Sequence, residues 1–315
     1  MVCKGTIAYL REGEDAVLLL LLLIVAGVIY LLVPRKPEAP AWGELKAEYA
    51  GVDYTGCART VIQRDAGTPN QFFVEYPGED SDVVKGLLIL PEAVETPVPL
   101  ILLAHGLGGT KEEIIQSFAP EVLKLGMAVF ALDLPLHGER SVTSVNLYEN
   151  LNVRRAMFYG IREWLVAVEW LSTHEQIDSS RIALLGYSLG SMIGVITAAL
   201  HPGVSALALC VGGESILPRV SRLPRRLRRL AWPISPSLFA QQIAPRPVLM
   251  LNGLHDETVL PAHAELLWQS LGEPREIQWY SCGHHLPEIA GERAVQWLYT
   301  QVTGGSQRPA SPAVE

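Results

Sequence analysis

The sequence predicts an α/β domain built around a mostly parallel β-sheet, and three observations favour it. Short, wholly apolar runs alternate with longer segments of helical periodicity, which is typical of a parallel sheet buried on both faces. Turn-forming residues separate these segments. The chain has 315 residues, of which 49% are hydrophobic, enough to bury a large core and to exclude disorder of the whole chain. We expect this domain over residues 45–303.

The expected strands form two groups. An opening antiparallel portion comprises 57–63, 71–76 and 83–90, and these runs are separated by Gly- and Pro-containing turns. The parallel portion comprises 100–104, 128–132, 182–185, 206–211, 248–251 and 276–280. The helices are expected between the parallel strands, at 112–125, 151–173, 189–200, 262–271 and 288–302.

The N-terminal region contains an apolar run at 16–33. It has 18 residues without a charge and would span roughly 27 Å as a helix, which matches a membrane. A cleaved signal peptide is the alternative, but residues 11–15 (REGED) are mostly acidic where a signal peptide is basic. We predict an N-terminal flank at 1–15, a transmembrane helix at 16–33 and a Pro-rich linker at 34–44.

The charges around this run predict a single-pass membrane protein whose folded domain faces the cytoplasm. Arg35 and Lys36 adjoin the carboxyl end of the run, whereas Lys4 and Arg11 lie farther from its amino end. The positive-inside rule therefore favours the cytoplasmic side. Residues 304–315 show no periodicity and are predicted to be a disordered tail.

Charge and cysteine content exclude some classes of partner. The net charge of -8 and the pI of about 5.6 give no overall attraction to nucleic acid. The four cysteines are scattered, with neither metal-ligand nor disulfide spacing: Cys3, Cys57, Cys210 and Cys282. We expect free thiols, no zinc site and no nucleic-acid partner.

One motif predicts a nucleophile. Gly186-Tyr187-Ser188-Leu189-Gly190 lies directly between the apolar run at 182–185 and the helical segment at 189–200. A sharp strand-to-helix turn of this form exposes the serine hydroxyl, and its glycines prevent steric collisions. A tight turn with an incidental serine is the alternative. We predict that Ser188 is the nucleophile.

A serine hydroxyl needs a base to remove its proton and an acid to orient that base. Asp256 and His284 each follow an expected strand, and open α/β sheets place their sites at this carboxyl edge. Glu257 and His285 are the adjacent competitors. Asp256 is favoured because it fits the pattern G-x-x-D-x-x-V from Gly253.

An acyl-transfer site also needs two backbone donors for a developing oxyanion. The N–H of Leu189, the residue after the predicted nucleophile, supplies one. The second is expected from His105-Gly106-Leu107-Gly108-Gly109, where glycines allow the backbone to approach a substrate. We assign it to Leu107.

Taken together, HGLGG, DLPLHGER, GYSLG, NGLHDETV and GHHLP resemble the α/β-hydrolase superfamily, nearest its dienelactone-hydrolase-like and acyl-peptidase-like esterase branch. The resemblance covers about 83–302. It implies Ser188 as nucleophile, Asp256 as acid, His284 as the base directly after glycine, and no metal or organic cofactor. Dienelactone hydrolases use cysteine, so the serine argues against dienelactone as substrate.

The superfamily inserts cap elements after the strand at 206–211, which places a cap at about 213–240. Residues 216–232 contain six arginines and no acid, and Pro218 and Pro224 should break the segment into short helices. A solvated cap and a basic amphipathic cap that contacts anionic lipid are both open.

The predicted function is that of a membrane-tethered serine esterase or lipase-like hydrolase acting on a small or lipid-like acyl ester. The same catalytic trio would serve a peptidase or a thioesterase. A non-catalytic membrane scaffold that retains the fold is a further alternative.

Overall fold

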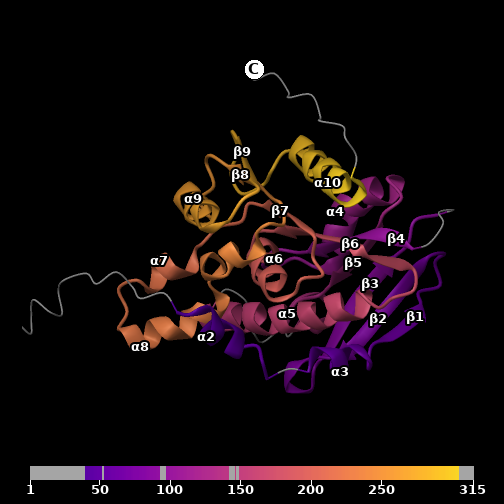
Figure 1. Cartoon of the computed structure of the whole chain (residues 1–315), viewed down its shortest axis with the longest axis horizontal. Coiled ribbons are helices and arrows are strands. Elements are labelled where there is room, and N and C mark those ends of the chain that lie inside the picture. The colour runs from indigo at the N-terminus through magenta and orange to yellow at the C-terminus, as the bar shows by residue number, and fades with distance from the viewer. Residues whose placement is uncertain (1–39, 52, 93–96, 142–145, 147–148, 305–315) are drawn as a thin grey trace, which may run out of the picture. The chain divides into compact units, whose positions relative to one another are not determined.

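The computed structural model describes residues 40–51, 53–92, 97–141, 146 and 149–304. A nine-stranded sheet crosses this part of the chain in the order β1-β2-β3-β5-β4-β6-β7-β8-β9 (Figure 1). The strands are β1 (Ile62–Asp65), β2 (Gln71–Pro77), β3 (Val83–Ile89), β4 (Val98–Ala104), β5 (Ala128–Leu132), β6 (Ile177–Tyr187), β7 (Ala206–Cys210), β8 (Val248–Gly253) and β9 (Arg275–Tyr280).

The sheet changes from antiparallel to parallel along its width, as the sequence predicts. Pairs β1–β2, β2–β3 and β3–β5 are antiparallel, and all pairs from β5 to β9 are parallel. The helices are α2 (Trp42–Ala47), α3 (Tyr54–Ala58), α4 (Lys111–Lys124), α5 (Asn150–Leu171), α6 (Leu189–Leu200), α7 (Ile216–Val220), α8 (Arg225–Arg228), α9 (Pro261–Ser270) and α10 (Glu288–Thr303).

Two hydrophobic cores cover the two faces of the sheet. Side chains alternate along β4, so that Leu100 and Leu102 belong to one core and Ile101 and Leu103 to the other. The first core includes buried residues of α5, α6 and α9, and the second includes those of α4 and α10. This burial on both faces explains why the parallel strands are apolar without interruption.

The start of the folded domain differs from the prediction in two places. Only the last two residues of the expected strand at 57–63 belong to β1, because residues up to Ala58 form α3 and β1 begins at Ile62. The Asp53 side chain accepts a hydrogen bond from the N–H of Gly56 and caps α3. The predicted boundary between linker and domain at residues 44 and 45 is also wrong, because helix α2 begins at Trp42.

The predicted cap region contains short helices, and one of its two predicted breaks is wrong. Besides α7 and α8 it holds three 3-10 turns, η3 (Arg229–Ile234), η4 (Pro236–Leu238) and η5 (Ala240–Ile243). Pro218 is the third residue of α7 and does not end it. The first turn of a helix tolerates proline because its N–H groups have no partner within the helix.

A buried ion pair joins the antiparallel and parallel portions of the domain. Arg140, whose side chain is 2% exposed, donates to both carboxylate oxygens of Glu163 at 2.7 Å and to Asp82 at 2.7 Å. Burial alone raises the pKa of Glu163, and the hydrogen bonds from Arg140 oppose that shift. Each charge is therefore tolerated only because the other is present.

Replacing Arg140 with methionine should lower the free energy of unfolding of the full chain by about 3–5 kcal/mol, because Glu163 then lacks its counter-ion. Chemical denaturation monitored by circular dichroism measures this change. Arg64→Met removes a 3.0 Å ion pair from an arginine that is 61% exposed, and should cost about 1 kcal/mol or less. Equal losses in the two variants would contradict the role given to burial.

No helix within the described ranges is long and apolar enough to cross a membrane. The predicted flank at 1–15, the predicted transmembrane helix at 16–33 and residues 305–315 of the predicted tail lie outside the described residues. The same holds for residues 34–39 of the predicted linker. These four assignments stay predictions.

Candidate active site

Ser188 occupies a strained turn between β6 and α6. Its φ of 52° and ψ of -113° are unusual for a residue with a side chain, and backbone strain of this kind is concentrated at functional sites. The Ser188 N–H donates to the carbonyl of Cys210 at 2.8 Å, which ties the turn to the neighbouring strand β7. The turn is therefore held by the sheet, and the hydroxyl is left at the amino end of α6.

The flanking glycines are required by close backbone contacts. A Cβ at Gly186 would lie 2.6 Å from the carbonyl oxygen of Gly190, and a Cβ at Gly190 would lie 2.0 Å from that of Ala104. No side chain fits at such distances. The G-x-S-x-G spacing is thus explained by how tightly this turn packs between β4 and α6.

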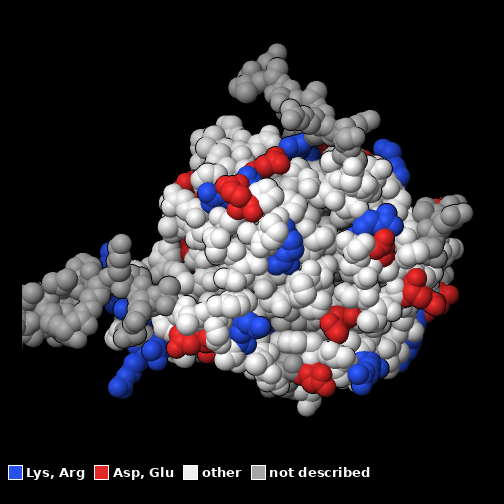
Figure 2. All heavy atoms as spheres, viewed as in Figure 1, with Lys and Arg blue, Asp and Glu red and all other residues white. Residues whose placement is uncertain are grey.

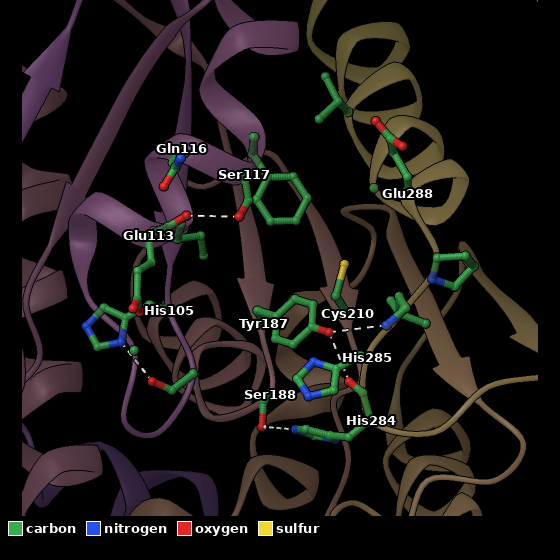
Figure 3. A pocket seen from close by; sticks show the side chains of 18 of the residues that line it. His105, Glu113, Gln116, Ser117, Tyr187, Ser188, Cys210, His284, His285 and Glu288 are labelled. Carbon is green, nitrogen blue, oxygen red and sulfur yellow. Dashed lines mark hydrogen bonds between the residues drawn. The ribbon is translucent and has the colours of Figure 1, made fainter.

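Three side chains from distant parts of the sequence form one hydrogen-bonded chain at the carboxyl edge of the sheet. His284 Nε2 lies 2.9 Å from Ser188 Oγ, and His284 Nδ1 lies 2.7 Å from Asp256 Oδ2. Figure 3 shows the contact between Ser188 and His284. The second Asp256 oxygen, Oδ1, accepts from the N–H groups of Thr258 and Val259 at 2.8 and 2.9 Å. Asp256 is 2% exposed, so its carboxylate is held in one orientation.

The neighbouring residues take no part in this chain. His285 is exposed, and its ring lies 6.3 Å from that of His284. Glu257 is exposed as well. The fold therefore brings together Ser188, Asp256 and His284, and leaves the two adjacent alternatives outside the hydrogen-bonded chain.

The two predicted backbone donors lie on either side of Ser188. Leu189 is the first residue of α6, where backbone N–H groups have no partner within the helix. Leu107 lies in the loop between β4 and α4, and a Cβ on its neighbour Gly106 would come within 3.4 Å of the Ser188 Cβ. Gly108 has a φ of +79°, which glycine adopts without strain.

Tyr187 makes contacts that the sequence analysis did not identify. Its hydroxyl donates to the backbone carbonyl of His284 at 2.9 Å and accepts from the N–H of Leu286 at 3.3 Å. Burial raises the pKa of Tyr187, so the phenol keeps its proton. This hydroxyl therefore holds the loop at His284 and at the second residue after it (Figure 3).

Tyr187→Phe should lower kcat by roughly fivefold to tenfold, the equivalent of one lost hydrogen bond, while KM stays nearly unchanged. Tyr187 is a positioning residue in this interpretation, because it acts through His284. Steady-state kinetics on a chromogenic ester would separate the two constants. The matched control is Tyr299→Phe, since the Tyr299 hydroxyl has no hydrogen bond to a described residue; a kcat as low as that of Tyr187→Phe would contradict this role.

His105 is a structural residue of the loop that carries Leu107. Its Nδ1 lies 2.8 Å from the carbonyl oxygen of Gly106, and its Nε2 accepts from the N–H of Leu134 at 3.1 Å. Burial lowers the pKa of His105 to about 4, so the ring is neutral and binds both groups as one donor and one acceptor. It anchors the glycine loop to the residues that follow β5.

A nearby acidic cluster carries its own counter-ion. Glu112, Asp133 and Glu139 have ligand atoms close enough to hold a metal ion. However, the ammonium group of Lys111 lies 2.7, 2.8 and 2.5 Å from these three carboxylates, in that order. Burial alone would lower the pKa of Lys111, but these carboxylates outweigh it and the net shift is upward. The charged lysine therefore occupies the position between the three carboxylates and offsets part of their negative charge.

A cavity of about 880 Å³ extends from Ser188 and His284. Its walls come from the loop at Leu107, from α4 and from α10; Figure 3 shows Glu113, Gln116 and Ser117 across from Glu288. Among the described residues, no lysine or arginine lines it, and four glutamates do: Glu113, Glu121, Glu288 and Glu292. The cavity suits an uncharged ligand better than an anionic one.

Comparisons with known proteins agree with this architecture. A family model described as the alpha/beta hydrolase fold matches residues 99–244. The putative hydrolase YtaP of Bacillus subtilis (strain 168) is 28% identical over 190 residues, which are 53% of this chain and 64% of that protein. The esterase YjfP of Escherichia coli (strain K12) is 24% identical over 205 residues, covering 60% of this chain and 80% of that protein.

Among solved structures, acetyl xylan esterase 1 from Thermoanaerobacterium sp. superposes with a TM-score of 0.69 at 15% identity, covering 84% of this chain and 96% of that chain. At this identity the likeness shows a shared fold. The matched family model, the sheet order and the superposed structure lead to one conclusion: the chain has the α/β-hydrolase fold.

Proposed function

We propose that this protein is a serine esterase that cleaves carboxylic esters through an acyl-enzyme on Ser188. The observation that supports the proposal best is the continuous hydrogen-bonded chain from Asp256 through His284 to Ser188, which opens into a cavity large enough for a small ester. The esterase named among its relatives agrees with an ester as the substrate.

In the first half of the reaction, Ser188 Oγ attacks the ester carbonyl carbon and its proton passes to His284 Nε2. Asp256 stabilises the resulting imidazolium through Nδ1. The N–H groups of Leu189 and Leu107 donate to the oxyanion. The intermediate then expels the alcohol, which takes the proton from His284, and an acyl ester is left on Ser188.

In the second half, water replaces the alcohol. His284 removes a proton from the water as its oxygen attacks the acyl carbon, and then returns that proton to Ser188 Oγ as the acid leaves. Every proton is thus passed through one imidazole. The scheme uses only side chains and backbone groups of this chain.

A substrate panel tests the proposal. We expect kcat/KM to be highest for nitrophenyl acetate, lower for the matching thioester and much lower for the nitroanilide. Faster cleavage of the thioester or of the nitroanilide would instead assign a thioesterase or a peptidase. No cleavage of any of them, with no labelling by a fluorophosphonate, would support the non-catalytic scaffold.

The glutamates that line the cavity should make the enzyme select against negatively charged esters. A nitrophenyl ester with a free carboxylate on its acyl chain should react about fivefold more slowly than its uncharged isostere, because one added negative charge near the lining glutamates costs about 1 kcal/mol. Raising the salt concentration should narrow the difference. Equal rates at low salt would exclude an effect of these glutamates on specificity.

We also propose that residues 16–33 anchor the protein in a membrane and that the hydrolase domain lies on the cytoplasmic side. Arg35 and Lys36, directly after the apolar run, are what supports this orientation. Protease added to intact cells should spare the domain and digest it only after permeabilisation. Digestion in intact cells would place the domain outside.

A further inference from the structure

The cap presents an exposed surface on which arginines and leucines alternate. We name it the arginine–leucine ledge; it comprises Arg219, Arg222, Leu223, Arg226, Leu227, Arg229 and Leu230, on α7, α8, the turn between them and the start of η3. The three leucines are 43%, 48% and 55% exposed, in chain order. Leu223 lies in the turn before α8, Leu227 in α8 and Leu230 in η3.

Each exposed leucine directly follows an arginine, so apolar and positive side chains alternate along the segment. Arg222 and Arg226 are exposed and form no ion pair with a described residue. Six arginines and no acid occur from 216 to 232 in a chain whose net charge is -8. The ledge therefore combines arginines that form no ion pair among the described residues with apolar side chains left in water, and Figure 2 shows blue Lys and Arg side chains where Figure 1 labels α8.

The first described residues pack against this same part of the domain. The Trp42 ring lies 6.0 Å from that of Phe239, edge to face, and the Tyr49 hydroxyl donates to the Pro233 carbonyl at 2.5 Å. Pro233 belongs to η3, which also carries Arg229 and Leu230.

The connection to the predicted anchor is short. Six residues, 34–39, separate the apolar run at 16–33 from Pro40, and when fully extended they reach about 20 Å. If the apolar run enters a bilayer, the length of these six residues limits how far Pro40 can lie from that bilayer.

From these observations we propose that the arginine–leucine ledge binds an anionic lipid surface. The leucines enter the headgroup region and the guanidinium groups bind lipid phosphates and carboxylates. A second copy of this chain fits the ledge poorly, because two such surfaces would bring their unpaired arginines together. The proposal does not depend on the esterase activity.

Hydrogen exchange of the full chain, reconstituted into vesicles, tests the proposal. One set of vesicles is phosphatidylcholine alone, and the other is equal parts phosphatidylcholine and phosphatidylserine. We expect slower backbone exchange over 219–230 in the vesicles that contain phosphatidylserine. Arg222→Glu with Arg226→Glu should abolish the difference between the two lipids.

The matched control is Arg59→Glu with Lys124→Glu, which changes the net charge equally at exposed positions outside the ledge and should keep the difference. Equal exchange of the native ledge in the two kinds of vesicle would overturn the proposal, as would failure of the full chain to associate with either. A further result would also overturn the proposal: backbone exchange of the ledge that becomes slower as the protein concentration rises, in detergent without lipid. That result would indicate that the ledge binds a second copy of this chain.

Discussion

Ser188→Ala should lower kcat by about 10⁴-fold or more, equivalent to some 5 kcal/mol of lost transition-state stabilisation. The reason is geometric: His284 Nε2 lies 2.9 Å from Ser188 Oγ, and without that oxygen there is no acyl acceptor. Backbone donors can still polarise a bound ester, so a small residual rate is expected. Turnover of nitrophenyl acetate, together with loss of fluorophosphonate labelling, measures the effect.

Ser117→Ala is the matched control. Ser117 lines the same cavity, but its hydroxyl donates to the backbone carbonyl of Glu113 within α4, so its loss should change kcat by less than about twofold. Circular dichroism should show both variants folded. Undiminished turnover by a folded Ser188→Ala protein would remove Ser188 from the mechanism.

Much of the fold could be predicted because the central strands are buried on both faces. The apolar runs at 128–132 and 206–211 correspond closely to β5 and β7, since strands of a parallel sheet covered on both faces are apolar on both faces. The run at 182–185 identified only the core of β6, which extends from Ile177 to Tyr187. Residues 178–181, near the amino end of β6, are polar and partly exposed. Hydropathy therefore does not distinguish them from a loop.

The start of the domain was harder to predict for a local reason. Thr60, Val61 and Ile62 favour a strand by composition. The cap formed by Asp53 instead starts a short helix that includes Cys57. Capping depends on one side-chain contact, whereas hydropathy averages over several residues.

The site illustrates what sequence spacing can and cannot establish. Chain order and strand ends were enough to select Ser188, Asp256 and His284 as candidates, and these side chains lie within hydrogen-bonding distance of one another. The contact between Tyr187 and the His284 loop joins residues 97 positions apart. No local pattern contains that information, because it depends on how β6 and the loop after β9 approach each other.

The choice between His284 and His285 leads to the second large effect. His284→Ala should lower kcat by about 10⁴-fold, because proton removal from Ser188 and protonation of the leaving alcohol both pass through this ring. His285→Ala should retain kcat within about threefold, since the His285 ring is exposed and contacts neither Ser188 nor Asp256. Steady-state kinetics of the two purified variants on nitrophenyl acetate make the comparison.

The two variants control for each other, because both remove an imidazole from the same loop and any general loosening of the loop should affect them alike. A fluorophosphonate separates the two explanations further: Ser188 in folded His284→Ala should label far more slowly than in His285→Ala, as its hydroxyl then has no base. The reverse pattern of activities would transfer the role of base to His285. It would also require the loop after β9 to shift by one residue in the active protein, since Asp256 contacts only the first of the two histidines.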